Sequence, residues 1–224
     1  MKDFLESINL FYNVKEDFLS HAASLCKTKQ YPKSSMIILE EEYGDKLFIV
    51  KEGTVKITRV NDEGKEVILA LLGSSEIFGE MAILDGESRS ANVLAQENCN
   101  LIVISSEDFI EILKDNFKVS FALMSELAKK IRKSDLQIEA LSLSDAEHRI
   151  GVSILSLAED MGVIRNGKVT IQNLPFQQDI ANMAGTSRET VSRVMKTFED
   201  RNLILKEGHT VVIPDYLYFK GFFK

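Results

Sequence analysis

The pattern of hydrophobic and polar residues changes twice along the chain, and each of the three stretches predicts a different kind of element. Residues 1–25 place apolar side chains at helical spacing, as in Phe4, Leu5 and Ile8. From about residue 26 to 104 the chain changes to short β-rich runs separated by turn signals. Strands are expected at residues 36–40, 46–51, 54–60, 66–72, 90–95 and 100–105. Strands this short and this regularly spaced predict an antiparallel sandwich or barrel.

A long helical region is expected next, from the polar cluster at residues 105–108, which suits a helix N-cap, to about Leu143. Within it, residues recur at alternating intervals of three and four, which is an a/d heptad pattern: Phe117, Ser120, Met124, Leu127, Ile131, Ser134, Ile138 and Leu141. This pattern predicts a coiled coil between two copies of the chain. A single amphipathic helix packed on its own domain would explain part of it.

The C-terminal third predicts a helix-turn-helix between small hairpins. Residues 143–145 are interpreted as a hinge, a new helix is expected at 146–160, and a turn at 165–168 closes a hairpin. Two short helices follow residue 176, separated by Gly185 and Ser187, which suit a helix stop and a helix N-cap. Residues 203–206 and 210–213 are expected to form a hairpin wing, and the aromatic tail at 216–219 to pack against the protein.

Composition narrows the class of protein. The 224 residues allow one large or two modest domains. No apolar run approaches the roughly 18–20 residues that span a bilayer, and the acidic N-terminus lacks the apolar core of a signal peptide. We therefore expect a cytoplasmic protein without membrane contact. The two cysteines, Cys26 and Cys99, and the three histidines are scattered, so free buried thiols and no metal site are expected.

The net charge of −7 is unevenly distributed. Residues 1–145 hold 17 Lys and Arg against 25 Asp and Glu, whereas residues 146–224 hold 10 against 9. The acidic excess thus belongs to the N-terminal part. The C-terminal part can still bind DNA if its basic residues share one face.

One short stretch combines the groups that a phosphorylated sugar needs. Residues 78–84 are followed closely by residues 89–91. Gly79 allows close approach of the main chain to an anion at the start of a helix. Arg89 can clamp two phosphate oxygens, Ser90 can donate another hydrogen bond, and Glu80 can accept one from a ribose hydroxyl. The plain alternative is a surface turn with an ordinary Glu–Arg pair.

Two strings of sequence resemble known functional elements. Phe-Gly-Glu-Met-Ala-Ile-Leu with the later Arg-Ser-Ala resembles the phosphate-binding cassette of cyclic-nucleotide-binding domains. Gly-Thr-Ser-Arg-Glu-Thr-Val-Ser-Arg at 185–193 resembles the recognition element of the Crp–Fnr superfamily of transcription factors, nearest to its cyclic-AMP receptor branch. The resemblance covers nearly the whole chain and implies an α+β protein. It implies an N-terminal antiparallel β jelly roll at 1–106, a dimerisation helix and hinge at 107–145, and a winged helix-turn-helix at 146–224.

The same resemblance implies a ligand site. Its residues would be Gly79, Glu80, Arg89, Ser90 and Ala91, joined by Ser134 and Asp135 of the dimer helix, which fall where the family contacts the purine of its ligand. Cyclic AMP is the first candidate for the effector. Cyclic GMP remains possible, because a carboxylate at position 135 accepts hydrogen bonds from either purine.

A DNA interface is implied as well. Arg188, Glu189 and Arg193 would read base edges of a palindromic duplex. Phosphate contacts would come from Gln178, Ser187, Thr190 and Ser192. The expected protein is a bacterial homodimeric transcription regulator, joined through the 107–143 helix, that also meets RNA polymerase and is not an enzyme.

Three alternatives remain open from the residues alone. The same fold could sense cyclic GMP, another nucleotide, a redox change or a haem-bound gas. It could also act constitutively with an empty pocket. A kinase-regulatory subunit or an enzyme is disfavoured, since the chain shows neither a P-loop nor a nucleophile constellation.

Overall fold

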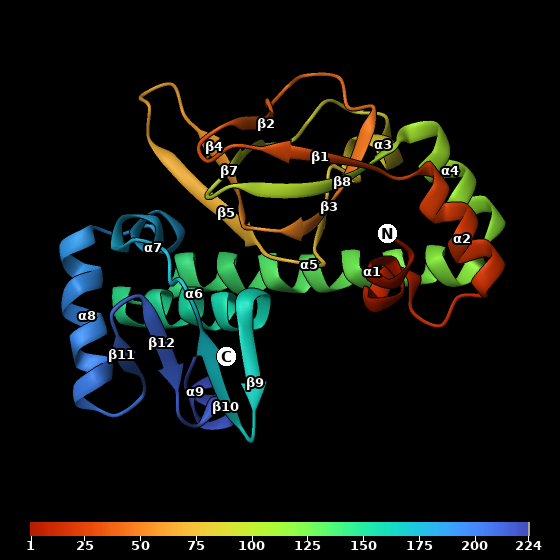
Figure 1. Cartoon of the computed structure of the whole chain (residues 1–224). Coiled ribbons are helices and arrows are strands. Elements are labelled where there is room, and N and C mark those ends of the chain that lie inside the picture. The colour runs from red at the N-terminus through yellow and green to blue at the C-terminus, as the bar shows by residue number, and fades with distance from the viewer. Residues whose placement is uncertain (224) are drawn as a thin grey trace. The chain divides into compact units, whose positions relative to one another are not determined.

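The computed structural model describes residues 1–223, which divide into two compact units. The first unit comprises residues 1–59 and 70–130, and the second comprises residues 60–69 and 131–224, as far as they are described. The long helix α5 (Phe117–Leu143) contributes residues to both (Figure 1).

Two four-stranded antiparallel sheets form a jelly roll, and most of their residues belong to the first unit, whereas Val60 and residues 66–69 belong to the second. One sheet has the strand order β1-β8-β3-β6 and the other β2-β7-β4-β5. Their bounds are β1 Lys27–Tyr31, β2 Met36–Ile38, β3 Lys46–Glu52, β4 Val55–Val60, β5 Glu66–Leu72, β6 Ile77–Phe78, β7 Asn92–Ala95 and β8 Cys99–Ser105. Side chains from both sheets share one buried cluster, in which Phe48 stacks on Phe78 with ring centroids 5.0 Å apart. The expected antiparallel roll is confirmed.

Helices close one end of this roll. They are α1 (Lys2–Ser7), a 3-10 turn at Asn9–Phe11, α2 (Glu16–Leu25) and α4 (Ser106–Asp115), and they share a second core with the start of α5 (Figure 1). Fully buried Phe11 and Phe109 belong to this core. Burying such large aromatic side chains supplies much of the driving force that holds helices against a sheet.

Three sequence expectations about the first unit need correction. Strands β1 and β6 were not predicted, because β1 alternates lysines with polar residues and β6 has only two residues. The helical region expected from residue 107 to 143 is two helices, since Asn116 is extended (φ −141°) and its side chain accepts a hydrogen bond from the N–H of Lys118. Cys26 ends helix α2 and is only half-buried, whereas Cys99 is buried in β8.

The apolar pattern of α5 also differs from the predicted heptad seam. Ser120 donates a hydrogen bond to the Leu113 carbonyl at 2.6 Å, and Leu127 packs against the core of its own unit. Both positions therefore face inward. Five of the large apolar side chains that α5 leaves exposed by half or more recur at heptad spacing, and we call them the α5 stripe: Phe117, Phe121, Met124, Ile131 and Ile138.

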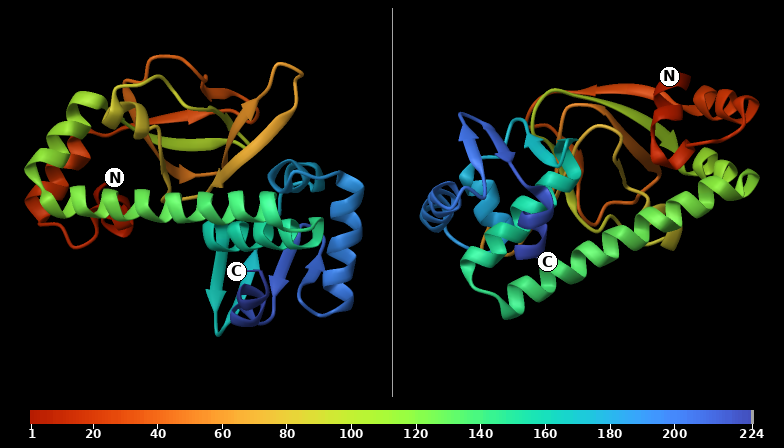
Figure 2. Two further views of the ribbon diagram at one scale, coloured as in Figure 1. Left: turned by 180° about the vertical axis from the view of Figure 1, so that it is seen from behind. Right: turned by 90° about the horizontal axis from the view of Figure 1, so that it is seen from below.

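The second unit is a winged helix-turn-helix (Figure 2). Its helices are α6 (Ala146–Met161), α7 (Gln177–Ala184), α8 (Arg188–Asp200) and α9 (Tyr216–Phe222). Its sheet has the order β11-β12-β10-β9, from β9 (Gly162–Arg165), β10 (Lys168–Ile171), β11 (Leu205–Glu207) and β12 (Thr210–Ile213). The aromatic tail packs only in part: Phe219 is buried against Phe198 and Phe223, with ring centroids 6.1 and 4.8 Å apart, whereas Leu217 and Tyr218 are exposed.

Candidate ligand cassette and nucleic-acid interface

The cassette begins where β6 ends and the short helix α3 (Met81–Asp85) starts. Gly79 lies at this junction with φ +81°, a backbone conformation that favours glycine. A Cβ added at Gly79 would lie 2.8 Å from Nη1 of Arg89 and 3.0 Å from the Lys46 carbonyl. Gly79 is therefore required both by its backbone angle and by the arginine beside it.

Arg89 is buried beneath this junction, with only 6% of its surface exposed. Its Nη1 donates to the Gly79 carbonyl at 2.7 Å, and its Nη2 donates to the Lys46 carbonyl at 2.8 Å. Burial lowers the pKa of the guanidinium, and the carboxylates of Asp45 and Glu80 oppose that shift. A guanidinium has five N–H groups, so two bonds to carbonyls hold the fork in place and leave others for an anion.

Glu80 is the second buried charge of the cassette, with 3% of its surface exposed. Lys130 of α5 donates to Glu80 Oε1 at 2.7 Å and to the Ile77 carbonyl at 3.1 Å. A buried carboxylate needs such a partner, since desolvation penalises an unpaired charge. Lys130 was not among the site residues predicted from the sequence. The sequence feature that pointed to Lys130 is its position four residues before Ser134, because residues four apart lie on one side of a helix.

The remaining ligand candidates fall into two groups. Ser90 is exposed, and its hydroxyl lies 3.9 Å from the weakly accepting sulfur of Met81, while Ala91 is buried. The first unit thus brings together Gly79, Glu80, Arg89, Ser90 and Ala91. Ser134 and Asp135 lie on α5 in the second unit, and both are exposed. Asp135 falls within the α5 stripe, between Ile131 and Ile138.

The helix-turn-helix begins with α7 and turns at Gly185. Gly185 has φ +57° and ends α7, and the Ser187 hydroxyl then accepts the N–H of Thr190 at 3.2 Å as the N-cap of α8. Val191 and Phe198 are among the side chains that α8 buries. The expected helix stop and N-cap are both confirmed by these contacts.

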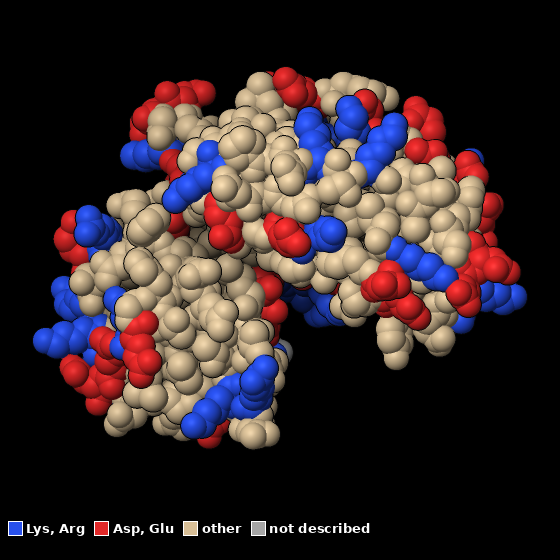
Figure 3. Space-filling model, in the orientation of Figure 1, with Lys and Arg blue, Asp and Glu red and all other residues tan. Residues whose placement is uncertain are grey.

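The outer side of α8 presents the residues expected to read DNA. Arg188, Glu189, Ser192 and Arg193 are exposed, whereas Thr190 is half-buried. Hydrogen bonds from its own backbone N–H and from the Ser187 hydroxyl lower the pKa of Glu189. Gln178 is exposed on α7 and donates to Asn182 at 2.9 Å. Basic side chains gather over α8 in the space-filling view, with acidic ones beside them (Figure 3).

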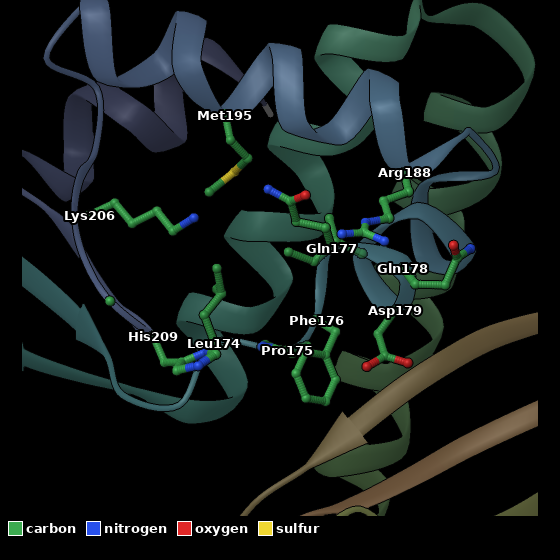
Figure 4. A pocket seen from close by; sticks show the side chains of 12 residues that line it. Leu174, Pro175, Phe176, Gln177, Gln178, Asp179, Arg188, Met195, Lys206 and His209 are labelled. Atoms are coloured by element: carbon green, nitrogen blue, oxygen red, sulfur yellow. The ribbon is translucent and has the colours of Figure 1, made fainter.

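A pocket of about 470 Å³ lies between the start of α7, helix α8 and the wing. Arg188 approaches it from the recognition helix and Lys206 from β11, on opposite sides (Figure 4). His209, in the turn of the wing, also lines it. Neither Lys206 nor His209 was predicted as a site residue from the sequence, although a Lys and a His on either side of the Gly208 turn of a hairpin were a visible signal.

Known proteins match both halves of this chain. The cyclic nucleotide-binding domain family matches residues 28–116, and the Crp-like helix-turn-helix domain family matches residues 149–218. The cyclic AMP receptor protein of Thermus thermophilus is 32% identical, over 92% of each chain. This chain belongs to the Crp–Fnr family of transcription regulators.

Further regulators resemble this chain in sequence or in structure. The cAMP-activated global transcriptional regulator CRP of Haemophilus influenzae is 33% identical, over 88% of this chain and 86% of that protein. The solved catabolite activator protein of Thermus thermophilus has a TM-score of 0.55 and 29% identity, over 96% of this chain and 98% of that one. FixK2 from Bradyrhizobium japonicum has a TM-score of 0.75 at 18% identity, over 88% and 96%, which shows the shared fold.

Metal-binding residue types and the Cys26 thiol also bear on the chemistry of this Crp–Fnr chain. Across residues 1–223 the structure has no group of three or more His, Cys, Asp or Glu that could hold a metal ion. Burial raises the pKa of the Cys26 thiol to about 12, so that thiol stays protonated. None of the described helices is long and apolar enough to cross a membrane.

Proposed function

We propose that this regulator is gated by a cyclic nucleotide, with cyclic AMP the first candidate. The observation that carries the proposal is the buried Arg89 guanidinium, held by two backbone carbonyls beside Glu80. A buried, pre-oriented cation binds a phosphate strongly, because little side-chain entropy is lost and water screens the charge poorly. The cyclic AMP regulators among the relatives support the same effector.

Within this proposal each cassette residue has a role. Arg89 and Ser90 bind the cyclic phosphate, Glu80 accepts from the ribose hydroxyl, and Gly79 and Ala91 keep the main chain close. Ser134 and Asp135 meet the purine from the dimer helix. Residues 1–106 then sense the effector, 107–145 couple the two copies, and 146–224 bind DNA.

The α5 stripe supports a homodimer. Phe117, Phe121 and Met124 leave 75%, 58% and 52% of their surfaces exposed on one helix. Side chains of this size are rarely left together in water, and a parallel second copy of α5 would cover them at heptad spacing. The occupant we propose is therefore the same helix of a second chain.

The dimer would read a palindrome with one recognition helix in each half-site, about 34–36 Å apart. Arg188 and Arg193 suit the edge of guanine, and Glu189 suits the amino group of cytosine. Gln178, Ser187, Thr190 and Ser192 would bind phosphates and fix the register. RNA polymerase is the further partner that we expect for a regulator that binds promoter DNA.

Titration calorimetry with cyclic AMP and cyclic GMP tests the effector. We expect Arg89→Gln to weaken nucleotide binding by about 100-fold or more, since each charge-assisted bond contributes roughly 1.5–3 kcal/mol. Arg59→Gln is the matched control, because Arg59 is exposed on β4 and pairs with Glu40 at the surface. Thermal melting establishes that both variants fold. Heat from neither nucleotide with the wild-type protein would contradict the proposal.

One observation favours a second candidate, a regulator that needs no effector. Lys130 already neutralises Glu80, and two backbone carbonyls already accept hydrogen bonds from Arg89. The charged groups of the cassette therefore have partners within the protein itself. DNA binding measured by fluorescence anisotropy with and without nucleotide separates the two. Equal affinity in both conditions would favour the effector-independent regulator.

A further inference from the structure

One arginine of α6 joins the ends of two other helices within the second unit. Arg149 donates from Nε to the Ala184 carbonyl at 2.9 Å and from Nη1 to the Ser144 carbonyl at 3.0 Å. Its Nη2 also approaches the Gly185 carbonyl at 3.4 Å. A single half-buried side chain therefore binds three backbone carbonyls from two separate segments.

These carbonyls belong to helix C-termini. Ala184 is the last residue of α7, and Ser144 directly follows the last residue of α5. The final carbonyls of a helix lack partners within it, and the helix dipole is negative there. A planar guanidinium can satisfy such groups on both sides at once, whereas a lysine ammonium is a compact point charge.

A packing contact joins the same two places. A Cβ added at Gly185 would lie 3.1 Å from Cδ2 of Leu141, in the last turn of α5. Ala140 beside it is buried. The end of α5 thus lies directly against the turn that leads into the recognition helix α8.

We propose that Arg149 is the positioning residue that fixes the recognition helix to the end of the dimer helix, and so sets the spacing of the two recognition helices on DNA. The proposal rests on the proposed function, since it needs a dimer that reads a palindrome. Arg149 itself lies outside the DNA-reading side of α8. Its role is to couple the position of the turn at Gly185 to the position of Ser144, so that both copies hold their recognition helices at one separation.

The experiment compares three DNA duplexes by fluorescence anisotropy, each with cyclic AMP present. They are the palindrome that the wild-type protein selects from a random library, the same palindrome with two base pairs inserted at its centre, and one half-site alone. Wild type is compared with Arg149→Ala and Arg149→Lys. Arg201→Ala is the matched control, because Arg201 is a partly exposed arginine that pairs with the Glu147 side chain of the same helix.

We expect wild type and the control to prefer the correctly spaced palindrome strongly. Both Arg149 variants should lose roughly tenfold of that preference while half-site affinity is unchanged, because loosened recognition helices tolerate altered spacing. Arg149→Lys should resemble Arg149→Ala, since a point charge cannot bridge the three carbonyls.

Two results would overturn the inference. One is unchanged spacing preference in a folded Arg149 variant, with folding checked by thermal melting. The other is equal weakening on all three duplexes, which indicates a general structural role; Arg149→Lys supplies the comparison if Arg149→Ala fails to fold. Failure of the wild-type protein to select any palindrome would instead contradict the proposed function.

Discussion

The buried pair of Glu80 and Lys130 shows how single residues hold the cassette in a defined state. Glu80 is almost fully buried, whereas 37% of the Lys130 side chain is exposed. Removing the lysine alone leaves a buried carboxylate without its hydrogen-bond donor, which is worse than removing both charges. The lysine therefore matters most through the charge that it neutralises.

We expect Lys130→Met to lower the free energy of unfolding by about 1–2 kcal/mol, a value reduced because solvent partly screens the lysine. Adding Glu80→Gln should recover most of this loss, since no buried carboxylate then remains without its lysine partner. Urea denaturation of the two single variants and the double variant measures the coupling. Simple additivity of the two effects would show that the ion pair does not stabilise the cassette.

Sequence alone supplied the cassette but not its partner from α5. Gly79, Glu80 and Arg89 lie within eleven positions of one another, so their combined chemistry was visible as a local motif. Lys130 is 50 positions from Glu80, and its contact depends on how α5 packs against β6. No periodicity within a helix specifies which distant carboxylate a given lysine will meet.

Helix α5 carries two apolar sides, and this explains the error in the predicted seam. Val119, Leu123 and Leu127 face the core of the first unit, whereas the α5 stripe faces outward. Apolar residues on both sides recur at the three- and four-residue spacing of a helix, so the sequence pattern alone does not separate one side from the other. The break at Asn116 was missed for a related reason, because apolar periodicity continues through the extended residue.

The outward register places a charge in the dimer seam. Asp135 lies four residues after Ile131 and three before Ile138, which is an a position of the α5 stripe. Two copies of α5 would bring two Asp135 carboxylates into one layer, where like charges repel. We expect Asp135→Leu to tighten the dimer by about tenfold or more, as measured by sedimentation equilibrium.

Two further variants make this measurement decisive. Glu139→Leu adds the same apolar side chain outside the α5 stripe and should leave the dimer constant nearly unchanged. Ser134→Leu tests the register expected from the sequence, in which Ser134 rather than Asp135 lies in the dimer seam. Tightening by Ser134→Leu alone would restore the seam expected from the sequence and contradict the outward register.

At the scale of the whole molecule, acidic and basic residues are distributed unevenly between the N-terminal and C-terminal parts of the chain. The excess acid lies within residues 1–145, which disfavours nucleic acid there, and we expect the basic side chains of residues 146–224 to make the contact with DNA. Composition alone revealed this asymmetry. It could not place Lys206 and Arg188 on opposite sides of one pocket, because that arrangement depends on how the wing folds beside α8.

Lys206 should bind a DNA phosphate at this pocket. We expect Lys206→Gln to weaken binding to specific and random duplexes alike, and to reduce the slope of log affinity against log salt by about 1 per contact, or about 2 per dimer. Lys168→Gln, on the exposed start of β10 outside the pocket, is the control. An unchanged salt slope for Lys206→Gln would remove this residue from the interface.

The α5 stripe has a genetic consequence. Its apolar side chains are the same on every copy of the chain, so the stripe cannot distinguish a working partner from a defective one. A variant with a disabled recognition helix keeps the whole stripe and would enter mixed pairs with wild-type chains. Such a mutation should therefore act dominantly when the two alleles are expressed together, whereas a mutation that disrupts the stripe should be recessive.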